Sequence, residues 1–282
     1  MQDINLYEKI IMYDDKFPVK LGMAKKEGMV PETLLFSSHW HEHLELWYLK
    51  SGTVNISHNG RATVIHGGDL AIANSNELHA AHSVSEAMEY FSIIIDPKFF
   101  ATELGQGHFV FHNIISGDTA VRNFYQEIFE EYQTHAVGYD MAIKAKLYEL
   151  LVYLVRNHIA RHITQEEYIA RANKLDRILP AVQYIESHYN TEISYSELAR
   201  LLNVSKYHFC HLFKEATGKT VVQYINDVRL DKAYHLLKNT DMNITQISMS
   251  VGFNDMNYFS RLFRKQKNIS PSKVRSQETR AL

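Results

Sequence analysis

The sequence predicts an α+β protein of two domains, a small β-barrel followed by an all-helical region. Residues 34–95 form short segments of alternating polarity separated by turn residues, whereas apolar residues after Asp96 recur at helical spacing. A third observation is a pattern that occurs twice, at 196–214 and at 245–264. With 282 residues and 45% hydrophobic content, the chain is long enough to build a core in each domain.

Charge and cysteine content restrict the functional class. Residues 171–282 contain 17 Lys and Arg against 10 Asp and Glu, whereas residues 1–170 contain 13 against 22, so only the C-terminal half suits a polyanion such as DNA. The single cysteine, Cys210, excludes an internal disulfide and agrees with a reducing cytosol. The longest apolar run, at 150–155, is too short to span a bilayer, and we expect a cytoplasmic protein without a membrane partner.

The first domain is expected to consist of short antiparallel strands. Asn59-Gly60 lies between two alternating segments and predicts a two-residue hairpin, and Gly67-Gly68-Asp69 predicts another turn. Strands at this spacing are typical of a small barrel or jelly roll. The segments are LELWYLKSG, TVNISHNG, ATVIHGGD, LAIANSNE and EYFSIIID.

The stretch HWHEHLELWYLKSG at 39–52 is the most polar of these segments. In one extended strand, alternate side chains from His39 to Trp47 would project to the same face. Three imidazoles and a carboxylate do not make a hydrophobic core, so this face has three interpretations: a polar effector pocket, a metal site, or an exposed or structural cluster. The residues are His39, His41, His43, Glu45 and Trp47.

Two helices are predicted after the barrel, at 119–133 and 139–159. The apolar stripe of the second is expected to mediate dimer contact, the alternative being that it covers the barrel. The polar segment 163–173 is expected to be a linker, with partial helix as an alternative, between a sensor domain at 1–162 and a DNA-binding domain at 174–282. A helix at 174–188 contains Pro180, which predicts a kink or a late start.

Each copy of the repeated pattern predicts a short helix, a tight turn and a second helix. Asn203 and Gly252 lie where the first helix of each copy must stop, a position that favours positive φ. Ser196, Ser205 and Asp255 are expected to cap helices. This is the helix-turn-helix layout, in which the second helix enters the DNA major groove.

The segment 220–239 between the copies predicts one continuous helix. Such a helix is roughly 30 Å long, and one turn of B-DNA is about 34 Å. A rigid connector of this length would hold two reading helices over successive major-groove faces on one side of the DNA.

The C-terminal pattern is similar to the DNA-binding domain of the AraC/XylS family of bacterial transcription regulators. The similarity rests on two helix-turn-helices, on Arg229, Gly252-Phe253 and Tyr258-Phe259, and on the final SPSKVR around Pro271. Ser248, Asn268 and Val274 depart from the family pattern and affect the packing of its last part. The resemblance implies that Arg229 braces the two lobes of the domain.

The N-terminal domain resembles a cupin, the barrel that regulators of this family commonly carry for a small effector. His39-x-His41-x3-Glu45-x6-Gly52 resembles the first cupin motif, and Gly68-x5-Asn74 followed by His79 resembles the second, although Asn74 and Asn76 replace the usual Pro and Gly. Metal-binding cupins use two His, a Glu and a further His, and imidazole with carboxylate suits Zn, Fe, Mn or Ni. The implied effector residues are His39, His41, His43, Glu45, Trp47 and His79, and the metal candidates among them are His39, His41, Glu45 and His79.

The outward faces of the two reading helices supply the expected DNA contacts. Asn257 and Arg261 are the strongest candidates for base reading, because Asn and Arg make bidentate contacts with adenine and guanine. The full base-reading set is Tyr207, Cys210, His211, Met256, Asn257, Ser260 and Arg261, and the phosphate-binding set is Lys206, Lys214, Arg264 and Lys265.

These observations and resemblances predict a non-enzymatic, effector-responsive regulator of transcription, an activator of a sugar catabolic operon. Its partners would be double-stranded DNA, a small-molecule effector, a second copy of the chain and RNA polymerase. No cofactor is required for this function, and a divalent metal is a candidate ligand. Two alternatives are a metal-dependent cupin enzyme fused to a DNA-binding module, and a regulator whose barrel only dimerises or binds protein.

Overall fold

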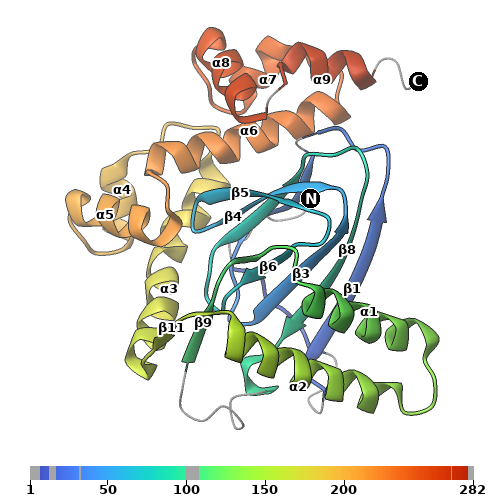
Figure 1. The fold of residues 1–282 in the computed structure, drawn as a ribbon. Coiled ribbons are helices and arrows are strands. Elements are labelled where there is room, and N and C mark those ends of the chain that lie inside the picture. Colours follow the sequence, from blue (N-terminus) through green and yellow to red (C-terminus); the bar gives the residue numbers. More distant parts are fainter. Residues whose placement is uncertain (1–6, 13–16, 32, 100–107, 268, 279–282) are drawn as a thin grey trace. The chain divides into compact units, whose positions relative to one another are not determined.

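A computed structural model describes residues 7–12, 17–31, 33–99, 108–267 and 269–278. The described residues form two compact units, one of them Tyr7–Leu175 and the other starting at Asp176 (Figure 1). Each unit has its own core, as expected from the length of the chain. None of the described helices is both long and apolar enough to cross a bilayer.

The first unit contains two antiparallel sheets and a two-stranded ribbon. The larger sheet has the order β1-β8-β3-β6-β10, the smaller one has the order β2-β7-β4-β5, and β11 pairs with β9. Apolar side chains from the five-stranded and the four-stranded sheet, such as Trp47 of β3 and Val54 of β4, pack together in the interior. The expected sheet-rich, cupin-like domain is therefore confirmed. The strands are β1 Val19–Lys26, β2 Leu34–His39, β3 Leu44–Ser51, β4 Thr53–His58, β5 Arg61–His66, β6 Leu70–Ala73, β7 His79–Ser83, β8 Met88–Ile95, β9 His108–Phe111, β10 Ile114–Ile115 and β11 Ile159–Ile163.

The predicted hairpin at Asn59-Gly60 is present. Strands β4 and β5 pair in register down to His58 opposite Arg61, leaving a two-residue turn. Asn59 has φ 49° and Gly60 has φ 77°, the positive values that a type I′ turn requires.

Helices α1 (Thr119–Thr134) and α2 (Tyr139–Asn157) form an antiparallel pair against the larger sheet (Figure 1). Asp118 caps α1 and accepts hydrogen bonds from the backbone N–H groups of the first turn. The apolar stripe of α2 lies in the same core as sheet residues, so it covers the barrel and is not available for the expected dimer contact. Its residues Ile143, Leu147, Leu150, Leu151 and Leu154 are all buried.

The second unit is helical, and most of the segment before it is helical as well. Helix α3 spans Gln165–His188, so most of the expected linker at 163–173 is helical and the late start is wrong. The hydroxyl of Thr164 accepts from the backbone N–H of Glu167 at 3.2 Å, and the following QEEYIARA is rich in good helix formers. A short 3₁₀ helix, η1, spans Pro97–Phe99 in the first unit.

Two helix-turn-helices follow, joined by one helix as predicted (Figure 1). The first consists of α4 (Tyr195–Leu201) and α5 (Lys206–Thr217), and the second of α7 (Ile244–Ser250) and α8 (Met256–Lys267). Helix α6 (Val221–Asn239) connects them, and α9 (Pro271–Glu278) ends the described chain.

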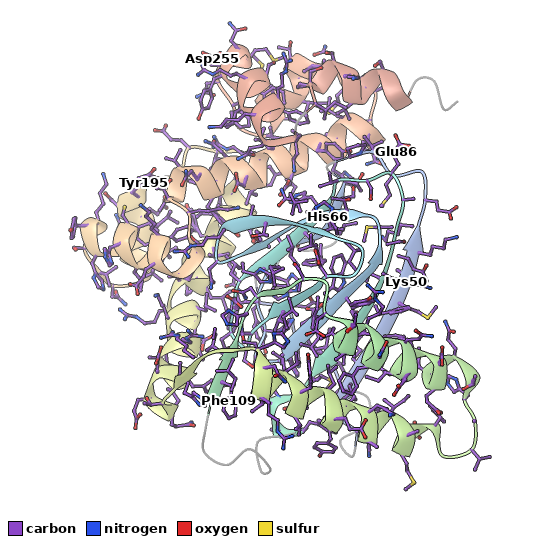
Figure 2. The ribbon with its side chains drawn as sticks, viewed as in Figure 1. Lys50, His66, Glu86, Phe109, Tyr195 and Asp255 are labelled. Atoms are coloured by element: carbon purple, nitrogen blue, oxygen red, sulfur yellow. The ribbon has the colours of Figure 1, made fainter. Side chains whose placement is uncertain are left out.

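The turns of the two motifs have the predicted backbone. Asn203 has φ 53° and Gly252 has φ 93°. Ser205 caps α5 and Asp255, labelled in Figure 2, accepts from the first N–H groups of α8. The expected cap at Ser196 is wrong, because α4 already begins at Tyr195, with Ser194 in the cap position.

Candidate functional site

The polar stretch 39–47 is not one strand. Strand β2 ends at His39 and β3 begins at Leu44, so the chain turns in between. This turn brings His41 to Glu45, and the pairing of β2 with β7 places His79 opposite His39. The cluster therefore depends on a chain reversal and on strand pairing rather than on alternation along one strand.

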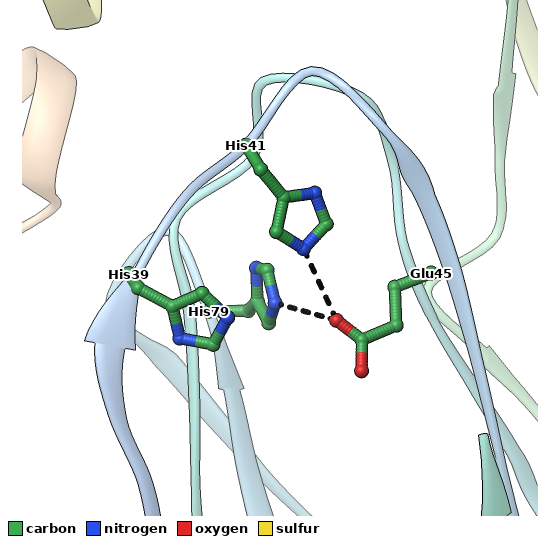
Figure 3. Close-up of side chains that lie close together, drawn as sticks. All are labelled: His39, His41, Glu45 and His79. Carbon is green, nitrogen blue, oxygen red and sulfur yellow. Dashed lines mark hydrogen bonds and ion pairs between the residues drawn. The ribbon is translucent and has the colours of Figure 1, made fainter. Parts of the chain in front are cut away.

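Four side chains converge in this cluster, which Figure 3 shows. The Nε2 atoms of His41 and His79 each lie 3.2 Å from the same Oε2 atom of Glu45. One ligand atom from each of His39, His41, Glu45 and His79 lies within 4.8 Å of every other. The three imidazoles are buried, and the Glu45 side chain is only 12% exposed.

Backbone carbonyls orient all three imidazoles. The Nδ1 atoms of His39, His41 and His79 lie 2.8, 3.2 and 2.8 Å from the carbonyl oxygens of Ser37, His43 and Glu77, respectively. Because a carbonyl only accepts, each Nδ1 carries the proton, and a neutral ring then presents the lone pair of Nε2 to the cluster. This tether to the second ring nitrogen is the arrangement found in metal-ligating histidines.

The charge of Glu45 requires a positive counterpart. Burial opposes ionisation of its carboxyl, but hydrogen bonds donated by His41 and His79 when their Nε2 atoms carry protons, together with the charge of these rings, lower its pKa. A carboxylate facing imidazole lone pairs is repelled unless a proton or a metal ion lies between them. Opposite donors at metal–ligand distances of about 2.0–2.2 Å are about 4 Å apart, so this donor set needs little contraction to hold a divalent transition metal.

Two of the expected effector residues lie outside this cluster. The Nε2 atom of His43 lies 3.9 Å from Asp96, and burial lowers the pKa of this imidazole. Trp47 packs between Phe36 and Tyr90 in the core, with ring centroids 5.7 and 4.4 Å away. The turn before Leu44 takes His43 off the strand, whereas Trp47 stays on the same face of β3 as Glu45 and packs beside Phe36.

The structure adds two residues that sequence reasoning missed. His58 lies opposite His79 on β4; its buried Nε2 has no hydrogen-bond partner among the described residues, and burial is the main cause that lowers its pKa to about 3. The alternation in TVNISH, which buries Val54, Ile56 and His58, was the signal for it. Glu8 lies 3.0 Å from Nε2 of His39, and no local pattern connects these two positions.

The second candidate site comprises the outward faces of α5 and α8. On α5, Phe209, Leu212 and Phe213 are buried. On α8, Phe259 and Phe263 occupy the inner face, and Met256 packs against the same core. The exposed members of the expected DNA-binding sets are Lys206, Tyr207, His211, Lys214, Asn257, Arg261, Arg264 and Lys265, and the half-buried members are Cys210, Met256 and Ser260.

Helix α6 holds α8 through polar side chains that the sequence did not single out. Asp231 forms a 2.5 Å ion pair with Lys267, and the amide of Asn226 donates to the hydroxyl of Tyr258 at 3.2 Å. Asp227 accepts from the side chain of Gln266 and pairs at 2.6 Å with Lys219, the residue after Gly218 at the end of α5. These contacts fix the position of the second reading helix on the connector.

Comparisons with known proteins match both units. Residues 31–151 match the family described as AraC-like ligand binding domain, and residues 198–277 match the Helix-turn-helix domain family. The activator RhaS of Klebsiella pneumoniae (strain 342) is 26% identical over 280 residues, which cover 94% of this chain and 96% of that protein. The uncharacterized regulator YdeC of Bacillus subtilis is 27% identical, with 83% and 84% covered.

Solved structures with detectable similarity include a response-regulator domain and the protein ToxT. The C-terminal domain of AraT, a response regulator from Geobacillus stearothermophilus, is 30% identical over 37% of this chain and 84% of that chain, with a TM-score of 0.34. ToxT from Vibrio cholerae O395 is 15% identical over 93% of this chain and 98% of that chain, with a TM-score of 0.44.

A cupin-like ligand-binding domain followed by two helix-turn-helices defines a DNA-binding regulator of transcription. The chain belongs to the AraC/XylS family of transcription regulators. This family consists of regulators and not of enzymes, so the interpretation as a cupin enzyme is set aside.

Proposed function

We propose that this regulator activates a sugar catabolic operon when an effector binds within residues 1–162, and that residues 174–282 read the operator. The observation that carries the proposal is the pair of exposed polar faces on α5 and α8, joined by the single helix α6. The name of RhaS, a transcriptional activator similar over 94% of this chain, supports activation.

In this proposal the exposed side chains divide into two roles. Asn257 and Arg261 on α8, with Tyr207 and His211 on α5, read base edges, and the half-buried Cys210, Met256 and Ser260 complete the base-reading set. Lys206, Lys214, Arg264 and Lys265 bind phosphates and set the register on DNA without carrying sequence information.

Two further partners belong to the proposal. Two chains would occupy two half-sites, and the exposed side of α2, with Met141, Ala145 and Val152, is the surface that remains for pairing after its apolar stripe is buried. An activator would also contact RNA polymerase from its DNA-bound position. Because the protein would act on DNA and on RNA polymerase, the proposal includes a cytoplasmic location.

The cluster supports two ligands for the sensor. An effector with hydroxyl groups could hydrogen-bond to Glu45 and to the unpartnered Nε2 of His58. A second candidate is a divalent metal held by His39, His41, Glu45 and His79, which is favoured by the three carbonyl-tethered imidazoles. Such a metal would supply a Lewis-acidic centre for oxygen donors of the effector.

The sensor proposal is tested by thermal unfolding of the full chain in the presence of sugars and of Zn²⁺, Mn²⁺, Fe²⁺ or Ni²⁺. A ligand present at about 100 times its Kd stabilises the native state by about 2.7 kcal/mol. We expect one sugar or metal to raise Tm, with loss of the shift in Glu45→Gln and its retention in Glu89→Gln, a control on β8 whose partner is the exposed Lys50. No shift with any compound, or an equal shift in both variants, contradicts the cluster as the sensor site.

The regulator proposal is tested by transcription from the promoter that the protein binds. If the protein is an activator, the bound effector should increase the amount of transcript made from a template with two half-sites. It should not increase the amount made from a template whose site is scrambled. Repression by the same ligand-bound protein would show the opposite sign of regulation.

A further inference from the structure

Residues 7–10 lie against the turn that carries His39 and His41. The backbone N–H of Glu8 donates to the carbonyl of Trp40 at 3.0 Å, and Tyr7 forms a β-bridge with the same residue. The rings of Tyr7 and Trp40 are 4.9 Å apart, and the hydroxyl of Tyr7 donates to the carboxylate of Glu42 at 3.2 Å. Ile10 is buried, so the segment is docked by backbone, aromatic and apolar contacts together.

This docking delivers a second carboxylate to the imidazole cluster. Oε2 of Glu8 lies 3.0 Å from Nε2 of His39, whose Nδ1 is held by the carbonyl of Ser37. A His39 ring with its single proton on Nδ1 presents the lone pair of Nε2 to the Glu8 oxygen, the same conflict that Glu45 has with His41 and His79. A proton on each ring would relieve it, and so would one metal ion shared by the three imidazoles and both carboxylates.

Two carboxylates and three neutral imidazoles match the charge of one divalent cation. The two carboxylates differ in exposure, because the Glu45 side chain is 12% exposed and the Glu8 side chain is 50% exposed. Water competes with Glu8 more readily than with Glu45, so a ligand bond to Glu8 would be the weaker and more exchangeable one.

We propose that Glu8 is a fifth, exchangeable ligand of a divalent transition metal bound by His39, His41, Glu45 and His79, and that metal binding holds residues 7–10 against Trp40. This inference rests on the metal candidate proposed above. It adds a ligand that lies outside the cupin-like motif, and it makes the position of the N-terminal segment depend on occupancy of the cluster.

The first experiment measures Zn²⁺ and Mn²⁺ affinity of the full chain by calorimetry. Loss of Glu8 in Glu8→Gln is expected to weaken binding about tenfold, whereas Glu45→Gln, which removes the buried carboxylate, is expected to weaken it about a hundredfold or more. Glu27→Gln, an exposed carboxylate paired with Lys25, serves as the control and should bind as the wild type does.

The second experiment measures tryptic cleavage after Lys9, an exposed residue within the docked segment, by mass spectrometry. Metal should slow cleavage at Lys9 in the wild type and in Glu27→Gln but not in Glu8→Gln. Equal affinity of wild type and Glu8→Gln, or a cleavage rate that metal does not change, overturns the inference about Glu8 while the four-residue metal site stands. A wild type that binds neither Zn²⁺ nor Mn²⁺ overturns both the inference about Glu8 and the proposed four-residue metal site. The sensor proposal would still stand in that case if a sugar raised Tm without metal.

Discussion

The Nε atom of Arg229 donates to the backbone carbonyl of Tyr189 over 2.6 Å, and Nη2 donates to the carbonyl of Thr191 over 2.8 Å. The same guanidinium lies over the ring of Phe253, 5.6 Å from its centroid. One side chain on α6 thus joins the segment after α3 to the turn of the second helix-turn-helix, which is the bracing role that the family resemblance implies.

Arg229→Ala is expected to lower the free energy of unfolding of the helical unit by about 2–4 kcal/mol, because two charge-assisted hydrogen bonds are lost and two carbonyls lose their partner. Arg229→Lys should recover little, since an ammonium cannot reproduce the planar fork. Urea denaturation followed by circular dichroism measures both, with exposed Lys273→Ala as the control. A loss no larger than that of the control would contradict the bracing role.

The two turns should respond differently to exchange of their residues. Gly252→Asn should destabilise by roughly 1–3 kcal/mol, because a Cβ there would lie 2.9 Å from the carbonyl of Tyr189 and 3.0 Å from the Arg229 guanidinium at φ +93°. Asn203→Gly should change stability by less than about 1 kcal/mol, since Asn tolerates its φ of 53° and Gly only loses more chain entropy. Thermal unfolding of the two variants tests this; equal effects would show that crowding at Gly252 is unimportant.

Arg261→Ala is expected to weaken binding to the specific operator by about 1–3 kcal/mol and to relax preference at one base pair. Lys214→Ala should weaken binding to all sequences alike and reduce the salt dependence by about one phosphate contact. Fluorescence anisotropy on specific and scrambled duplexes at several salt concentrations separates the two. Equal loss on both duplexes for Arg261→Ala would refute base reading by this residue.

The ion pair between Asp231 and Lys267 should respond asymmetrically to truncation. Lys267 is only 6% exposed, so Asp231→Ala leaves a buried ammonium without its partner and should cost about 3–5 kcal/mol. Lys267→Met removes the buried charge and keeps the volume of the side-chain stem, so it should lower the free energy of unfolding by less than Asp231→Ala does. Chemical denaturation compares them, and a larger loss for Lys267→Met would contradict this account.

Glu186 on α3 should make the helical unit less stable as pH rises. Burial raises the pKa of this carboxyl to about 7, against the opposing hydrogen bond from Tyr224 and the charge of Lys232. Between the unfolded pKa near 4.5 and the folded value near 7, the native state binds the extra proton, so stability falls with pH across this window and levels off above it. Relative to Glu186→Gln, the wild type should lose roughly 2 kcal/mol from pH 5 to pH 8, as measured by urea denaturation. A difference that stays constant over this range would contradict the shift.

The sequence by itself determined most features that depend on short-range pattern, an exception being the start of α4, where Ser194 and not Ser196 occupies the cap position. The spacing of Phe209 and Phe213 and of Phe259 and Phe263, with stop residues at Asn203 and Gly252, was sufficient for both helix-turn-helices. The period of 220–239 was sufficient for α6, and Asn59-Gly60 for its hairpin. Helix caps, turns and amphipathic faces are encoded within a few neighbouring residues, so they are readable without knowledge of the fold.

Only the tertiary structure decided which polar residues meet and which apolar stripe is covered. The turn after His39 takes His43 off the strand face, strand pairing brings in His58, and Glu8 arrives from the docked N-terminal segment. The apolar stripe of α2 is covered by the larger sheet. These outcomes depend on contacts between residues far apart in the chain, whose partners are selected by burial and hydrogen bonding in the folded molecule. Local periodicity marks a residue such as His58 as buried but does not identify its partner.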